Sequence, residues 1–376
     1  MKKNYLFTLI TCLLLLSCDS GSMEETPLQN NQNKAVFDKD VKIELNSDIP
    51  SRSIIRELSI DFKNVVEETP CEETELMAAF GEAFDDILAD PFAIGPFGYW
   101  AGIMLDINQV NALLGEGPQY FGDHGQYTNY VNKDVRNLEK FWNMPDEVSV
   151  RGQHNETLND KDAIVAALTS VWFFELPTEF AEMVADDIIA NNALSDVLPE
   201  SPFMASDGFA ADLDGYLGFD DEMIVIGDGL VKFVAGVGTD EKIAWTTILS
   251  HEWAHHVQFN NGYLEEYDLV FGNAPESTRA GELEADFMAS YYMTHKRGAT
   301  YNMKRIEQVL MNFFQIGDCG FLSSGHHGTP DQRMEASRLG SELAKGAQRN
   351  GHILSQEEVH QAFLAALPGI VAVPES

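Results

Sequence analysis

The chain has 376 residues, of which 44% are hydrophobic and 10% aromatic. This content is enough for one large core or two lobes, and it excludes a disordered protein. Lysine and arginine number 24 against 60 aspartates and glutamates, a formal net charge of −36, which excludes nucleic acid as a partner because a phosphate backbone would be repelled. The acidity fits solubility in a salty extracytoplasmic setting or, alternatively, a bias towards basic substrates.

The amino terminus has the features of an export signal. Met1-Lys2-Lys3 precedes an apolar run over residues 5–16, which is too short to span a membrane. Leu15-Leu16-Ser17-Cys18 resembles the cleavage box of bacterial lipoproteins, which implies removal of residues 1–17 and lipid on Cys18. An ordinary cleaved signal with an incidental cysteine is the alternative. Lipidation would anchor the protein to a membrane of the bacterial envelope, on an extracytoplasmic face, with the outer membrane as the favoured location.

The rest of the chain divides by composition into three segments. Residues 18–70 are polar and acidic and predict a tether. Residues 71–145 begin with a helical pattern that ends before Asp90-Pro91, and they predict a helical amino-terminal subdomain. Residues 146–376 form the larger domain. Further helices are expected over 160–174, 178–191 and 301–316, and after the caps at Thr329 and Ser355.

Two apolar runs precede the longest helical pattern. Residues 223–226 and 230–234 flank Gly227-Asp228-Gly229, which predicts a β-hairpin. An earlier alternation at Val148–Arg151 predicts another short strand. The acid-rich segment 207–222 could bind calcium, but it lacks the EF-hand spacing, and a solvated loop is the alternative.

The longest helical pattern carries the motif His251-Glu252-Trp253-Ala254-His255. It follows a cap-like Asp240 and stops near Gly262. Residues four apart lie on one face of a helix, so His251 and His255 should aim two imidazoles at one point. Glu252 lies about 100° round the helix axis from His251, close enough to reach a water held by a metal there. This is the zinc-binding HExxH arrangement, with the carboxylate as general base; a helix with two surface histidines is the alternative.

A second helical pattern offers the missing ligand. Catalytic zinc normally has three protein ligands and a water, and Glu282 on the pattern over residues 277–293 could be the third. Asp286, one turn further on, shares its face and could accept the second ring N–H of a ligand histidine. Glu284 is expected to point away from this pair, into solvent. The alternative is a solvated acidic stripe.

These motifs together resemble a known family. The HExxH helix followed by Glu282-Leu283-Glu284-Ala285-Asp286 is similar to the gluzincin metallopeptidases. With the segments 223–229 and 327–333, the chain resembles the bacterial neutral zinc metallopeptidase family over about residues 200–345, although its acidic amino-terminal region and the segment around Cys319 depart from that family. The resemblance implies a zincin-like fold for 146–376: mainly helical α+β, with a small antiparallel sheet beside the HExxH helix.

The resemblance also implies roles for individual residues. One Zn²⁺ per chain would be held by His251, His255 and Glu282, and it would polarise the scissile carbonyl and lower the pKa of its water. Glu252 would take the proton from that water. His327 would be an active-site residue that donates to the oxyanion or contacts the metal; an exposed loop histidine is the alternative.

The sequence therefore predicts a membrane-anchored zinc metallopeptidase that acts on peptide or protein substrates. A non-catalytic, zinc-containing binding or assembly lipoprotein of the envelope is the main alternative, and a zinc hydrolase of non-peptide amides is a third. Cys71 and Cys319 would form a disulfide in an oxidising compartment or remain two buried thiols. His256 is expected to turn off the metal face. Oligomeric state is not predicted.

Overall fold

The computed structural model describes residues 71–94, 100–115, 117–170, 175–212, 222–272, 274–320 and 326–372. The predicted signal segment 1–17, Cys18 and the tether 18–70 lie outside the described residues, as do residues 213–221 of the acid-rich segment. Within the described stretches, no helix is both long and apolar enough to cross a bilayer.

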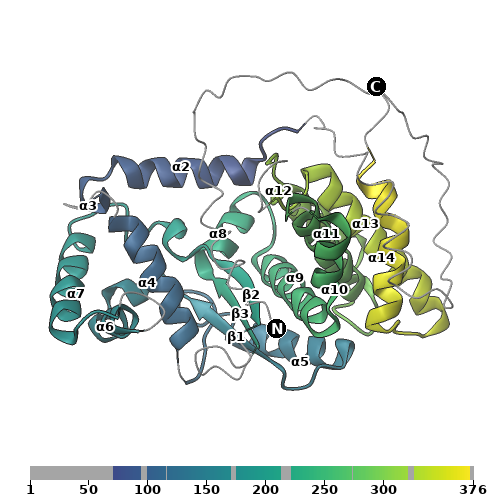
Figure 1. Ribbon diagram of the computed structural model, residues 1–376, viewed down its shortest axis with the longest axis horizontal. Coiled ribbons are helices and arrows are strands. Elements are labelled where there is room, and N and C mark those ends of the chain that lie inside the picture. The colour runs from purple at the N-terminus through teal and green to yellow at the C-terminus, as the bar shows by residue number, and fades with distance from the viewer. Residues whose placement is uncertain are drawn as a thin grey trace.

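The amino-terminal helices form one flank of the molecule, and α2 runs along its edge (Figure 1). They are α2 (Glu75–Ala89), α3 (Pro91–Ile94) and α4 (Trp100–Leu114), whereas α5 (Thr128–Trp142) lies apart from them, against α9 (Glu241–Asn261) (Figure 1). Helix α2 begins where the Thr74 hydroxyl accepts a hydrogen bond from the Met77 N–H and ends before Asp90-Pro91, as predicted. The Thr74 hydroxyl also donates to the Gln315 carbonyl at 2.6 Å, which ties α2 to a helix far along the chain.

A small mixed sheet lies at the centre. Its strands β1 (Val148–Gln153), β2 (Gly208–Asp212) and β3 (Glu222–Gly227) are ordered β1-β3-β2. The predicted first strand is confirmed, but a purely antiparallel sheet is wrong: β1 pairs parallel to β3, and only β2 is antiparallel to it. The parallel pair needs a long crossover, which is supplied by the segment with α6 (Lys161–Thr169) and α7 (Thr178–Asn192).

The predicted hairpin after β3 is also wrong, because residues 228–236 form helix α8 (Asp228–Gly236). Gly227 has an ordinary φ of −83°, so no tight turn forms there. The carbonyl oxygens of Pro202 and Ala205, in the short helix η4 (Pro202–Ala205), leave no room for a Cβ on Gly229 or Gly227. The glycines therefore permit close packing of backbone on backbone rather than a turn with positive φ.

The remaining helices cover the other side of the sheet. They are α9 (Glu241–Asn261), α10 (Tyr263–Phe271), α11 (Ala274–Thr294), α12 (Met303–Gln315), α13 (Pro330–Ala347) and α14 (Gln356–Ile370), with the short 3₁₀ turn η5 (Gln348–Asn350); another 3₁₀ turn, η3 (Asn155–Asn159), packs against α4, α6 and α7. Helix α9 packs against β2 and β3 on one side and α11 on the other, and α11 packs in turn on α13 (Figure 1). The capping boxes predicted at Thr329 and Ser355 are both present.

One continuous core joins these layers, with buried side chains from Leu76 to Val371. The predicted subdomain 71–145 and the domain 146–376 therefore share packing. A disulfide between Cys71 and Cys319, with Cα atoms 5.7 Å apart, links the start of α2 to the segment after α12. Of the two alternatives for these cysteines, the structure contains the disulfide.

Candidate metal centre

Helix α9 holds both motif histidines. The Asp240 carboxylate caps its start by accepting from the Lys242 N–H at 3.1 Å, and the helix ends at Gly262 with φ 71°. Both ends agree with the prediction. The Nε2 atoms of His251 and His255 lie 3.2 Å apart, so the spacing of four residues has directed two ring nitrogens to one point.

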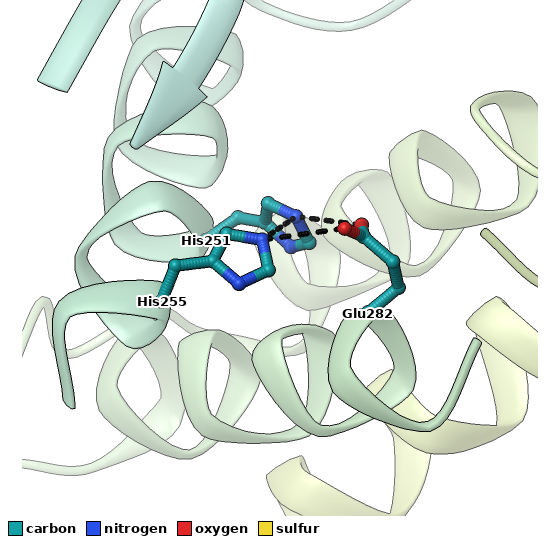
Figure 2. Close-up of side chains that lie close together, drawn as sticks. All are labelled: His251, His255 and Glu282. Carbon is teal, nitrogen blue, oxygen red and sulfur yellow. Dashed lines mark hydrogen bonds and ion pairs between the residues drawn. The ribbon is translucent and has the colours of Figure 1, made fainter. Parts of the chain in front are cut away.

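Helix α11 brings a carboxylate to the same point. Glu282 Oε2 lies 3.2 Å from Nε2 of His251, and Glu282 Oε1 lies 3.5 Å from Nε2 of His255. Figure 2 shows the two rings and the carboxylate pointing toward one another from separate helices. Their ligand atoms all lie within 4.8 Å of one another, and no other group of His, Cys, Asp or Glu in the described part of the chain is arranged to hold a metal.

The second nitrogen of each ring faces an acceptor. His251 Nδ1 lies 2.9 Å from Oδ1 of Asp286, and His255 Nδ1 lies 2.8 Å from Oε1 of Gln258. A proton on each Nδ1 leaves both Nε2 atoms with lone pairs that face each other and a carboxylate. These groups repel one another unless a cation lies among them, and two imidazoles with one carboxylate are a ligand set that zinc accepts. The residues therefore fit a zinc ion.

Burial and neighbouring charge act differently on the two rings. Burial lowers the pKa of His255 to about 4, which keeps this ring neutral near pH 7, as a metal ligand must be. Burial also lowers the pKa of His251, but the hydrogen bonds and charges of Asp286 and Glu282 outweigh it and raise that pKa to about 10. A proton on His251 would satisfy the same acidic neighbours, so a proton and a metal ion would compete for this position.

Asp286, the predicted partner of a ligand histidine, is held in turn by an arginine. Arg333, in the first turn of α13, donates from Nε to Asp286 Oδ2 at 2.7 Å and from Nη2 to Oδ1 at 2.8 Å. Its Nη2 also lies 3.5 Å from Oε2 of Glu282. A paired guanidinium compensates the charge of the buried carboxylate.

Glu284 does not face solvent, contrary to the prediction. Its side chain is completely buried and accepts hydrogen bonds from Gln258 Nε2 at 3.0 Å and from the Tyr267 hydroxyl at 2.8 Å. His360 Nδ1, on α14, lies 2.5 Å from its other oxygen. Helix α11 is enclosed by α9, α10 and α13, so the face opposite the ligands is as deeply buried as the ligand face.

This arrangement sets the orientation of the Gln258 amide. Its nitrogen donates to Glu284 and also to the Gly281 carbonyl at 2.8 Å, so its oxygen is the atom that faces His255 Nδ1. The tautomer of His255 is therefore controlled through Gln258 by a carboxylate on another helix. Neither the role of Gln258 nor that of Glu284 is predicted from the sequence, although Gln258 lies three residues after His255, a spacing that places the two on one helix face.

Glu252 lies beside the ligands in the wall of the same cavity. Its side chain is buried, and this burial raises its pKa to about 7, with the His251 charge opposing the shift. Gly208, the first residue of β2, lies next to it: a Cβ there would be in van der Waals contact with Glu252 Oε1, at 3.8 Å. The candidate base thus lies between the metal ligands and the edge strand of the sheet.

The two loop histidines, His326 and His327, lie in different environments. His326 is almost fully buried, and its Nδ1 lies 2.7 Å from Oδ1 of Asp318. His327 donates its backbone N–H to Asp318 Oδ2 at 2.7 Å and lies in the wall of the cavity that contains the triad. Asp318 accepts from both residues, and although burial opposes it, their hydrogen bonds and charges hold its pKa well below the usual range.

His256 turns away from the triad, as predicted. Its Nδ1 lies 2.8 Å from Oε2 of Glu222 and its Nε2 lies 3.0 Å from the Met223 carbonyl oxygen. This completely buried ring therefore joins α9 to β3 rather than to the metal ligands.

A comparison of the chain with models of known protein families, with curated proteins and with solved structures finds no match.

Proposed function

We propose that the chain is a zinc-dependent peptidase of gluzincin type that binds one zinc ion. The observation that carries this proposal is the convergence of His251, His255 and Glu282 beside a buried glutamate, Glu252, in one cavity. The three converging residues would hold the ion. Zinc bound there would polarise a peptide carbonyl and acidify water.

The chain's own groups would move the proton and stabilise charge. Glu252 would take a proton from the attacking water and return it to the leaving amine, and its raised pKa of about 7 suits both transfers near neutral pH. His327 would donate to the carbonyl oxygen as negative charge develops there. Asp286 and Gln258 would fix the rings of the two ligand histidines.

Two substitutions test this assignment. Glu252→Gln should keep one zinc per chain and lose at least about 100-fold in kcat on a mixed peptide library, while His251→Ala should lose the metal. Glu307→Gln, at an exposed position on α12, is the control and should change neither property. Hydrolysis retained by Glu252→Gln would remove Glu252 from the mechanism. Zinc in a wild-type protein that cuts no peptide would favour a binding or assembly role instead.

We also propose that residues 146–376 have a zincin-like fold and that lipid on Cys18 anchors the protein in the bacterial envelope. The position of β2 and β3 against α9 supports the first proposal. The Cys71–Cys319 disulfide supports an oxidising compartment. Cys18→Ser should release the protein from membranes into the soluble fraction, whereas Cys12→Ser should not; equal membrane association of both variants would contradict the anchor.

A further inference from the structure

The candidate metal centre opens into a cavity of about 800 Å³ that continues on both sides of the ligands, in the upper part of the range of ligand pockets. Along α9 its wall includes Ile248, then His251 and His255, and finally Phe259. Eleven residues of α-helix span about 16 Å, and an extended peptide advances about 3.3 Å per residue. The cavity therefore has room for about five residues of an extended chain, with the candidate base between its ends.

One side of the cavity is lined with aromatic side chains from α2 and its neighbours. Phe84 lies with its ring centroid 5.6 Å from that of Phe203, and Phe80 stacks on Phe233 at 4.1 Å. Phe80, Phe84, Phe203 and Leu230 all line the cavity. Because the disulfide at Cys71 and the cap of α2 fasten this helix to the segment around α12, the aromatic wall is a fixed part of the site.

The opposite side is apolar too, but it is built from different elements. Phe259 lies one turn beyond His255 on α9, with ring centroids 6.4 Å apart and nearly parallel. Leu264 of α10 completes this side and lies so close to Gly281 of α11 that a Cβ there would be 2.8 Å from Leu264 Cδ2. Bulky apolar side chains on either side of a scissile bond would therefore both meet apolar walls.

The charges of the cavity argue against recognition of the carboxy-terminal end of a chain. Among the described residues that line it, Arg333 is the only lysine or arginine, and its guanidinium is committed to Asp286 and Glu282. A carboxy-terminal carboxylate would find no available guanidinium or ammonium there, and it would share the cavity with the carboxylates of Glu73 and Asp268. An enzyme that removes residues from the amino terminus needs a wall that closes the cavity near the scissile bond. This cavity instead continues on both sides of the metal ligands.

We propose that the substrates are internal peptide segments with a bulky apolar residue on each side of the cleaved bond, so that the protein is an endopeptidase for apolar sequences. This inference rests on the proposed peptidase function. Phe84 would determine the preference on one side of the bond and Phe259 the preference on the other.

The test uses quenched fluorescent peptides with both ends blocked, in which leucine or phenylalanine flanks the central bond. Matched peptides carry serine or glutamate on one side or on the other. Wild type should cleave the doubly apolar peptide with a kcat/KM on the order of 100-fold above each serine peptide. Phe84→Ala should reduce this preference about 10-fold on one side of the bond only, and Phe259→Ala about 10-fold on the other side only.

Leu88→Ala is the matched control, because Leu88 lies on the same helix as Phe84, is 48% exposed and lies outside the cavity wall. It should leave both ratios unchanged. Thermal unfolding and zinc content would establish that each variant is folded and loaded. Phe84→Leu, which retains an apolar side chain, should keep a partial preference and replaces Phe84→Ala if that variant does not fold.

Binding to the inactive protein separates this inference from the peptidase proposal. A labelled doubly apolar peptide should bind zinc-loaded Glu252→Gln more tightly than the serine and glutamate peptides, as measured by fluorescence anisotropy. Equal cleavage of all blocked peptides, or cleavage only of peptides with a free end, would overturn the inference while the peptidase function stands. Selective binding without any cleavage by wild type would overturn the peptidase proposal and retain the apolar peptide site.

Discussion

Glu284→Gln should weaken both the fold and the metal centre, although Glu284 is not a predicted ligand. The wild-type carboxylate accepts from Gln258 and Tyr267 and faces the ring nitrogen of His360 at 2.5 Å. An amide has the same shape but only one oxygen. One of the three donors must then face an N–H group, and the ion pair with His360 is lost.

The size of the effect follows from the burial of this pair. Both side chains are 0% exposed, and removing one partner of a buried charge pair typically costs about 3–5 kcal/mol. We expect a loss of this size in the free energy of unfolding of the metal-free protein. Zinc affinity should fall by about 10-fold when the new amide nitrogen faces Gln258, because the Gly281 carbonyl would then be the one remaining acceptor that turns the Gln258 oxygen toward His255.

The deficit should also depend on pH. Burial lowers the pKa of His360, but the charge and hydrogen bond of Glu284, with Glu357 and Glu266 beyond, outweigh burial and raise it above the ordinary value. Stability from a raised folded-state pKa is complete below the unfolded pKa of about 6.5 and is lost as pH rises through the folded value. The difference between wild type and Glu284→Gln should therefore be largest below about pH 6.5 and shrink as pH increases.

Urea unfolding in excess chelator, followed by tryptophan fluorescence at several pH values, measures the stability difference, and competition with a chromophoric chelator measures the zinc affinity. Glu265→Gln, at an exposed position on α10, is the matched control and should change neither quantity. A stability loss below about 1 kcal/mol, the value expected of an exposed ion pair, or a deficit that grows with pH, would refute the reasoning.

Three further substitutions test the surroundings of the site. Asp286→Asn should lower zinc affinity about 10- to 100-fold in chelator competition, and wild-type affinity would show that Asp286 serves only to pair Arg333. Cys71→Ser should cost about 2–5 kcal/mol in unfolding experiments, a loss that mild reduction of the wild-type Cys71–Cys319 disulfide should reproduce and that equal stability of all three samples would contradict. His327→Ala should keep zinc and lower kcat about 100-fold; an unchanged kcat would leave His327 with a role in the loop alone.

The sequence predicted the local features of this molecule well because each depends on neighbouring residues. The caps at Asp240, Thr329 and Ser355 are present, since a cap is a hydrogen bond between residues two or three positions apart. The meeting of His251 and His255 follows for the same reason, from the period of the α-helix. Predictions that depend only on residues within one turn of a helix are therefore confirmed, because they do not depend on the rest of the fold.

The errors concern contacts between distant segments. Apolar runs on both sides of Gly227-Asp228-Gly229 fit a hairpin equally well, and only the close approach of Pro202 and Ala205 decides against it. Likewise, helical phase placed Glu284 opposite Glu282 correctly, but phase does not reveal how many sides of a helix are covered. Packing of α11 against five other helices, among them α14 with His360, buries a glutamate that was expected to face solvent.

The residues of the site that could be predicted are the metal ligands, whereas the residues that control the protons on those ligands could be predicted only in part. The ligands come from two helices close in sequence, and their residue types suffice to suggest zinc. The protons on those ligands are controlled from further away: Arg333 lies 47 residues beyond Asp286, and His360 lies 76 residues beyond Glu284. Asp286 could be identified from its place one turn after Glu282, but neither its arginine partner nor the role of Glu284 follows from the spacing of the metal ligands. The identity of the metal is thus suggested locally, whereas the protonation that would let His255 bind it depends on the complete fold.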